Sequence, residues 1–256
     1  MQQLRDRSYV LVASLGGLLA ASSLTVNAQA AATPAAPVEP KKPKWETSAF
    51  VGATLTRGNS KTLLVTGNIL TLHKWEKNEL SLGADGTYGE NDDVKNNESL
   101  HGFVQYNRLF TERLFGYARA DALHDGIADI EYRVTLSPGA GYYFIKSDKT
   151  TLSGEVGPGV VIEKKGAVEQ QYWTLRVAQK FEQKLSKVAR VWESLEYLPQ
   201  VDDFNNYILN AEIGLEAALT EKLSLATFLQ DSYNNVPAPG REKNDLKWVT
   251  GIKYKF

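Results

Sequence analysis

The stretch Asp245-Leu-Lys-Trp-Val-Thr-Gly-Ile-Lys-Tyr-Lys-Phe256 decides between the folds that this chain could adopt. The even-numbered positions of this stretch carry Leu, Trp, Thr, Ile, Tyr and Phe. The odd-numbered positions from 247 onward carry mainly Lys, with Val and Gly. Alternation with a period of two predicts a β-strand with one apolar face and one polar face. Such a strand fits the edge of a soluble sandwich. It also fits a barrel wall between lipid and a polar lumen.

The same alternation continues through most of the chain from Trp45 onward. Segments of roughly 10–14 residues are separated by turn-forming residues. They are longer than the average globular strand of about 5–6 residues, and long enough to cross a bilayer at a tilt. We expect about twelve strands, an even number that fits single-chain bacterial outer-membrane barrels. The expected strands are 46–57, 61–73, 78–89, 98–110, 113–124, 131–145, 150–163, 169–181, 188–198, 207–219, 222–233 and 244–256.

The connections between these strands fall into two groups that alternate along the chain. Those after even-numbered strands are tight and polar, whereas those after odd-numbered strands are longer and rich in Gly, Asp, Asn and Pro, apart from a short first turn at 57–60. Short periplasmic turns and longer extracellular loops are typical of an up-and-down barrel, and a Greek-key sandwich has no reason to show them. The sequence predicts an all-β, up-and-down antiparallel transmembrane β-barrel of about 12 strands with both termini periplasmic. The longer loops are 90–97, 125–130, 163–169, 200–206 and 234–244.

The amino-terminal residues are typical of an exported protein. Two arginines precede an apolar run at 9–24, and small residues follow it. This pattern predicts a secretory signal peptide over residues 1–28, cleaved after Ala28 or Ala30. No later segment has about 18 uninterrupted apolar residues, so we expect no membrane-spanning helix.

The composition of the chain limits the class of protein and the kinds of site that it can form. Residues 29–44 are rich in Pro, Ala and Lys, which predicts a periplasmic linker before a barrel over residues 45–256. The formal net charge is −1, so nothing points to nucleic acid, and the absence of cysteine excludes a disulfide framework or a thiolate metal site. The mean hydropathy of −0.32 is compatible with a membrane barrel, because its two faces cancel in any window.

The parity of each strand predicts which side chains face the lumen and which face the membrane. We expect charges of nearly balanced sign in the lumen, pairing with one another or lining a narrow wet path. We also expect an interfacial girdle of aromatic side chains at the periplasmic end. The lumen charges are Asp85, Arg119, Asp121, Arg133, Glu155, Arg176, Glu212, Glu216 and Lys247. The girdle consists of Trp45, Trp75, Phe110, Tyr142, Phe144 and Phe181, with Tyr254 and Phe256 as a carboxy-terminal assembly signal.

Several segments resemble a known family. They are Arg57-Gly-Asn-Ser-Lys-Thr62, Ser153-Gly-Glu-Val-Gly-Pro-Gly-Val-Val161, Leu195-Glu-Tyr-Leu-Pro199, Leu219-Thr-Glu-Lys-Leu-Ser-Leu225 and Asp231-Ser-Tyr-Asn-Asn-Val-Pro-Ala-Pro-Gly240. The chain is similar over about 45–256 to the YdiY-like, salt-induced outer-membrane proteins, a domain-of-unknown-function family. The resemblance implies a Gram-negative outer-membrane β-barrel of undefined activity. It supplies no catalytic residue.

Three functions remain open from the sequence. The first is a structural or envelope stress-adaptation barrel, or a narrow passive pore, without enzymatic activity. The second is an enzyme or ligand-binding barrel, related to lipid or divalent cations, around His124 with Asp121 and Asp125 at the extracellular rim. The third is a soluble periplasmic β protein. No serine is placed beside His124 by the alternation, so the first hypothesis is preferred.

The first hypothesis also fixes the expected surroundings of the protein. We expect an exported monomer in the cell outer membrane that contacts lipid and lipopolysaccharide. During biogenesis we expect the barrel assembly machinery to bind it. We expect no cofactor, no metal, no catalytic residue and no nucleic-acid partner.

Overall fold

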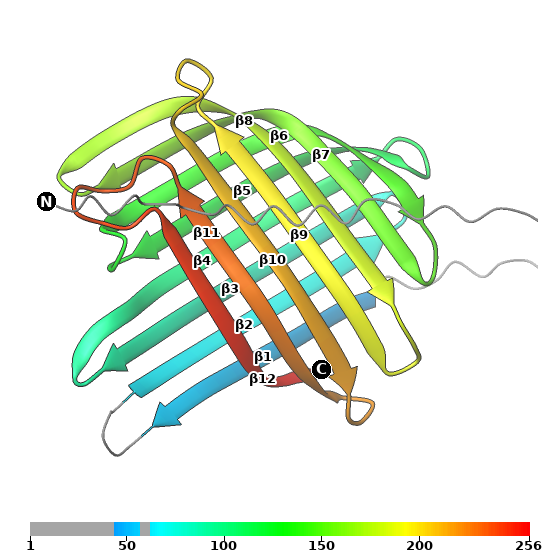
Figure 1. The fold of residues 1–256 in the computed structure, drawn as a ribbon. Helices are drawn as coiled ribbons and strands as arrows, with labels where there is room; N and C mark the ends of the chain where they lie inside the picture. The colour runs from blue at the N-terminus through cyan, green and yellow to red at the C-terminus, as the bar shows by residue number, and fades with distance from the viewer. Residues whose placement is uncertain (1–43, 57–61) are drawn as a thin grey trace, which may run out of the picture. The chain divides into compact units, whose positions relative to one another are not determined.

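The computed structural model describes residues 44–56 and 62–256 as twelve β-strands (Figure 1). The predicted signal peptide and the predicted turn at 57–60 lie outside these residues, as does the linker except for Lys44. Among the described residues no helix is long and apolar enough to span a membrane. The strands are β1 (Lys44–Thr56), β2 (Thr62–Trp75), β3 (Asn78–Asn91), β4 (Val94–Leu109), β5 (Leu114–Asp125), β6 (Ile130–Lys146), β7 (Thr150–Lys165), β8 (Val168–Lys184), β9 (Ala189–Pro199), β10 (Tyr207–Ala218), β11 (Leu223–Asn234) and β12 (Asn244–Lys255).

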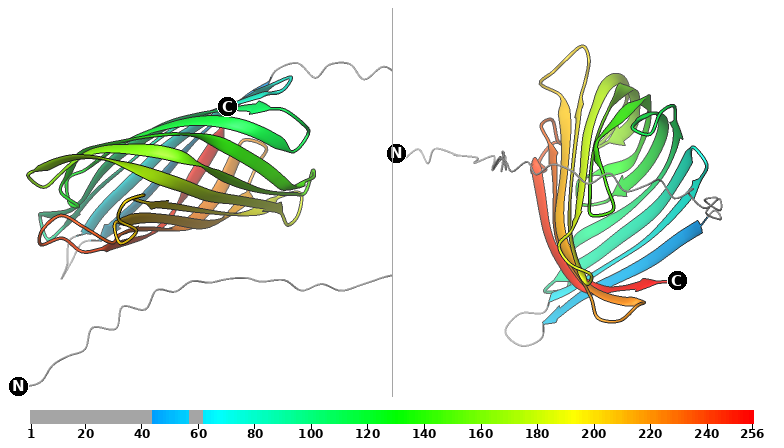
Figure 2. Two further views of the ribbon diagram at one scale, coloured as in Figure 1. Left: turned by 90° about the horizontal axis from the view of Figure 1, so that it is seen from above. Right: turned by 90° about the vertical axis from the view of Figure 1, so that its right-hand side faces the viewer.

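Each strand pairs antiparallel with its neighbours in the sequence, and β12 pairs with β1 to close the barrel. The strands tilt in a common direction around one interior (Figure 2). Closure leaves neither a first nor a last strand without a partner, which removes the edges that an open sheet would expose. The predicted all-β, twelve-stranded, up-and-down antiparallel barrel is confirmed.

The closing seam joins β12 to β1 over five residue pairs, from Ser48↔Lys255 to Gly52↔Gly251. The two strands approach very closely at its last pair, because a Cβ atom on Gly251 would lie only 2.2 Å from the carbonyl oxygen of Val51. Glycine is therefore required at this crossing point. The expected pairing of the last strand with the first is confirmed for Ser48–Gly52.

The two faces of each strand differ as the alternation predicts. In β12 the side chain of Trp248 is 76% exposed on the outside, whereas that of Val249 is 5% exposed and packs inside with Phe50 and Phe228. The outer surface of the other strands is also mainly apolar, and charged side chains gather inside. An apolar band outside and a polar interior are the requirements of a barrel in a bilayer.

The predicted loop lengths are wrong at two of the five longer connections. The strands continue through these two, so that the connections shrink to Asp92–Asp93 and Gly166–Ala167, whereas the connection at Gly126–Asp129 is within one residue of the predicted bounds at each end. Asp92 and Asp93 both have positive φ, as do Asp129 and Gly166, which allows such tight turns. The polar residues in these segments indicate strand ends that extend beyond the apolar band, and not loops. The loops at 200–206 and 235–243 remain long.

Candidate functional site: the polar lumen

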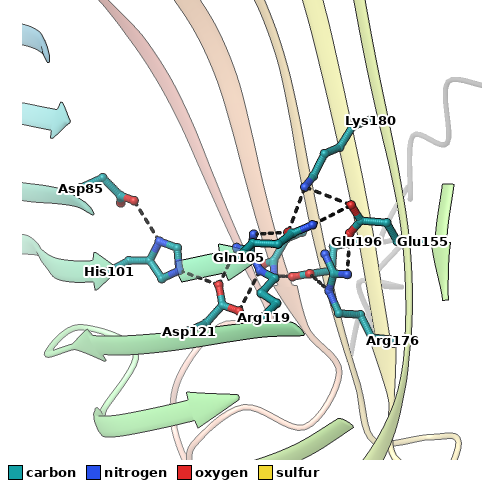
Figure 3. A network of polar contacts seen from close by, with 10 residues as sticks. Asp85, His101, Gln105, Arg119, Asp121, Glu155, Arg176, Lys180 and Glu196 are labelled. Atoms are coloured by element: carbon teal, nitrogen blue, oxygen red, sulfur yellow. Dashed lines mark hydrogen bonds and ion pairs between the residues drawn. The ribbon is translucent and has the colours of Figure 1, made fainter. Parts of the chain in front are cut away.

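The candidate site is the lumen of the barrel, where the nine predicted charges lie. The structure brings five of them, Asp85, Arg119, Asp121, Glu155 and Arg176, into one continuous chain of polar contacts. This chain is shown in Figure 3. The other four belong to separate groups along the wall.

The chain begins at a histidine that the sequence did not single out as a site. The Nδ1 atom of His101 lies 2.9 Å from Asp85, and its Nε2 atom lies 3.2 Å from Asp121. Because an ionised carboxylate only accepts hydrogen bonds, both contacts are satisfied when both ring nitrogens carry protons. Arg119 holds the other side of Asp121 with a hydrogen bond of 2.8 Å from its Nε atom. His101 on β4 thus links β3 to β5.

Gln105, which is 2% exposed, carries this chain across the lumen. Its Nε2 atom donates to Glu155 on β7 at 2.9 Å, and its Oε1 atom accepts from Arg119 at 3.1 Å and from Lys180 on β8 at 3.2 Å. Since β4 is not a neighbour of β7 or β8 in the sheet, the contacts of Gln105 with Glu155 and Lys180 span part of the interior. Polar side chains of β4, β7 and β8 therefore narrow the lumen at this level, which lies toward the end that carries the short turns.

Beyond Gln105 the chain continues through a buried ion pair. The guanidinium of Arg176 donates to Glu155 at 2.7 Å and to Glu196 at 2.6 Å, and it lies over the ring of Tyr117. The side chains of Arg176 and Glu155 are only 2% and 3% exposed. Breaking a buried pair is costly, because the remaining charge cannot recover its water shell.

The remaining predicted charges form smaller groups. Arg133 donates to Glu163 on β7 at 2.6 Å. Glu216 lies at the short-turn end within ion-pair distance of Arg190, Lys253 and Lys255. The carboxylate of Glu212 accepts a hydrogen bond of 2.6 Å from the indole N–H of Trp192. The Nζ atom of Lys247 lies 3.4 Å from the hydroxyl oxygen of Ser99 on β4. Sequence reasoning missed Glu163, which it assigned to a loop, and Gln105, which it named only as a neighbour of His101. The inward parity of each strand is the signal that identifies them.

Aromatic side chains fill part of the lumen next to the polar groups. Phe50, Phe228 and Val249 form one buried cluster with Trp192 packed against it. Phe115, Tyr117 and Tyr143 form a second, on β5 and β6. Both clusters narrow the lumen further.

A hollow of about 280 Å³ occupies the long-loop half of the lumen. Its lining begins at His101, Lys180 and Glu212 and extends to Pro237 and Asp245 near the long-loop end. Other described lining residues include five further carboxylates, at positions 85, 121, 125, 196 and 231. The hollow can hold water and small solutes above the constriction at Gln105.

The predicted rim site around His124 is not assembled. Its side chain is exposed, and the Nδ1 atom lies 2.9 Å from the backbone carbonyl oxygen of Glu131. Asp121 lies on the opposite, inward parity and contacts His101 instead. The described part of the chain also holds no group of three or more His, Cys, Asp or Glu residues arranged to bind a metal ion. His124 and Asp121 are therefore not brought together at this rim.

The predicted aromatic girdle lies at the end of the barrel that carries the short turns. Four of its members are exposed, and Trp75 and Phe181 are half-buried. Phe256 is exposed, and its backbone N–H donates to the carbonyl oxygen of Thr47 at 3.0 Å. The role of Tyr254 and Phe256 in assembly stays a prediction. A second exposed set, which includes Trp173 and Trp248 in the long-loop half, was not predicted as a girdle.

Comparison with known proteins places the chain in a family. A family model described as "Protein of unknown function, DUF481" matches residues 49–256. No curated protein matches the sequence. This confirms the predicted resemblance to a domain-of-unknown-function family over nearly the whole barrel.

Among solved structures, the chain is similar to a NanC porin, with a TM-score of 0.52 and 6% identity over 82% of this chain and 100% of that chain. A KdgM porin gives a TM-score of 0.47 with 9% identity over 83% and 99% of the two chains. The translocator domain of the autotransporter NalP from Neisseria meningitidis gives 0.45 with 13% identity over 83% and 87%. At 6% identity, the similarity to the NanC porin shows the barrel fold alone.

Proposed function

Because the chain belongs to the DUF481 family of proteins of unknown function, we propose an activity from the geometry of its lumen. The proposed activity is that of a narrow passive pore in the Gram-negative outer membrane. Water and small solutes cross it, and larger solutes are held back at the level of Gln105. The observation that carries the proposal is the polar crossing at Gln105, Glu155 and Lys180.

The crossing restricts passage without sealing the lumen by a packed apolar core. Its members are held by hydrogen bonds of 2.9–3.2 Å between side chains. The side chain of Lys180 remains 45% exposed although it reaches across the interior, so water has access to this level. Conduction through a barrel requires a wet path of this kind, and its width sets which solutes pass.

The outer surface of the barrel supports a position in the outer membrane. The outer face is apolar along the strands, and exposed aromatic side chains gather at the short-turn end. Closed barrels satisfy every strand edge internally, which is the requirement for spanning lipid. We propose that the long-loop end faces the outside of the cell and that the protein is a monomer in contact with lipid and lipopolysaccharide.

Replacing Gln105 with alanine is expected to increase the single-channel conductance of the refolded protein roughly twofold or more, because the crossing contact to the facing wall is removed. Planar-bilayer recording measures this directly. The matched control is Gln230→Ala, which shortens an amide that lines the hollow on β11 but forms no side-chain hydrogen bond across the lumen to any other described residue. Equal conductance of the two variants and the wild type would show that Gln105 does not limit passage.

A further inference from the structure

The long loop between β11 and β12, residues 235–243, lies at the same end of the barrel as the β7–β8 turn and the β9–β10 loop. At its start the backbone N–H of Asn235 donates to the carbonyl oxygen of Tyr207 at 3.0 Å, and the side-chain Nδ2 atom of Asn235 donates to the backbone carbonyl oxygen of Asn205 at 2.6 Å. The loop is therefore anchored beside the β9–β10 loop before it extends further.

The middle of this loop contacts the turn between β7 and β8. The Nζ atom of Lys165 donates to the carbonyl oxygen of Val236 at 2.6 Å. Ala238 is 2% exposed, and a Cβ atom built on Gly166 would lie 3.9 Å from its Cβ atom. Because β9 and β10 separate β8 from β11 in the sheet, the loop spans part of the mouth of the barrel.

The side chain of Lys165, which makes this contact with the loop, is itself held in place by neighbouring strands. Lys165 also pairs with the fully buried carboxylate of Glu163 at 3.3 Å. The same carboxylate accepts hydrogen bonds from Arg133 and from Gln170. Lys165 is thus held in place by β6, β7 and β8, and its ammonium group is directed at one backbone carbonyl of the loop.

The loop also forms part of the wall of the hollow. Pro237, Glu242 and Lys243 line it together with His101 and Glu212, which lie deeper in the barrel. A solute that enters the hollow from the long-loop end has to pass these residues. The loop and the constriction at Gln105 therefore act at two different levels.

We propose that residues 235–243 form a gate over the hollow and that Lys165 is the latch that holds it shut. Passage from the outside requires the loop to leave the β7–β8 turn, which breaks the Lys165–Val236 hydrogen bond and exposes Ala238. This regulation goes beyond a passive pore, whose width the crossing at Gln105 sets. It can be tested without measuring conduction.

The first experiment measures how fast a thiol inside the hollow reacts with a bulky, water-soluble maleimide. The natural chain has no cysteine, so Ser194→Cys on the wall of the hollow supplies a single reporter. Adding Lys165→Met is expected to raise its labelling rate roughly tenfold, because one charge-assisted hydrogen bond that holds the loop is lost. The control is Lys164→Met, which removes a lysine that pairs with Glu131 at the surface. Equal rates in both variants would remove Lys165 from the mechanism.

The second experiment locks the loop. The distance of 3.9 Å between the Cβ positions at Gly166 and Ala238 suits a disulfide bond. In the Ser194→Cys background, oxidised Gly166→Cys/Ala238→Cys is expected to label position 194 at least tenfold more slowly than the same protein before oxidation, as peptide mass spectrometry reports. Gly166→Cys alone is the control, because Gly166 has a φ of 59° that disfavours any side chain. An unchanged labelling rate after cross-linking would overturn the gate, whatever the conductance of the barrel.

Discussion

Arg176→Met is expected to lower the free energy of unfolding of the barrel by about 3–5 kcal/mol, because it leaves the carboxylate of Glu155 buried without its main partner. The 2.7 Å contact between the two side chains is almost fully shielded from water. Lys180 lies 3.4 Å from the other carboxylate oxygen, so part of the charge remains compensated. Urea unfolding in detergent micelles, followed by tryptophan fluorescence, measures the loss.

The matched control for this variant is Arg190→Met. Glu216 is as buried as Glu155, but Lys253 and Lys255 remain within 3.1 and 3.2 Å of it when Arg190 is removed. We expect a loss of about 1 kcal/mol there, since the carboxylate keeps two cations. The double variant Glu155→Gln/Arg176→Met should recover much of the stability, because the almost fully buried side chain at position 155 no longer carries a charge. Equal losses in Arg176→Met and Arg190→Met would contradict this account of the ion pair.

The pore is expected to prefer cations over anions several-fold, because the unpaired charges of the hollow are mostly carboxylates. Among the described lining residues, Glu212, Asp231, Glu242 and Asp245 have no basic partner within 4 Å, whereas the cations Arg119, Arg133, Arg176 and Lys180 are each paired with a carboxylate. Only Lys243 and Lys247 offer positive charge to oppose them. The reversal potential across a potassium chloride gradient measures the preference.

Removing carboxylate charges from β11 and β12 should reduce the preference of the pore for cations. The double variant Asp231→Asn/Asp245→Asn keeps the size of both side chains and removes two charges, so we expect its permeability ratio to fall toward one. Asp148→Asn, in the short turn at the other end of the barrel, is the control and should leave the ratio unchanged. An anion-selective wild-type pore would contradict the assignment of unpaired charge.

The strands and their faces were predictable because alternation with a period of two is a local property. The ends of β3 and β7 were not, since strand ends beyond the apolar band are as polar as loops, and Glu163 was placed in a loop for this reason. The interior contacts were harder still. Parity directs Gln105 and Glu155 inward, but their hydrogen bond depends on how closely two facing walls approach after closure.

The two histidines illustrate the same limit. His101 and His124 are both close to carboxylates in the sequence or across the sheet. Only the alternation of β5 shows that Asp121 turns inward, toward His101, while His124 turns outward. Side-chain parity was thus more informative than proximity along the chain.

Single-channel recording of the refolded wild-type protein tests the central claim most directly. A narrow polar lumen predicts a small conductance for potassium chloride, together with exclusion of disaccharides from liposomes that contain the protein. The folded state of each preparation is checked by its altered migration on gels after heating. A correctly folded barrel that leaves the bilayer silent would contradict the pore and leave a structural role in the membrane.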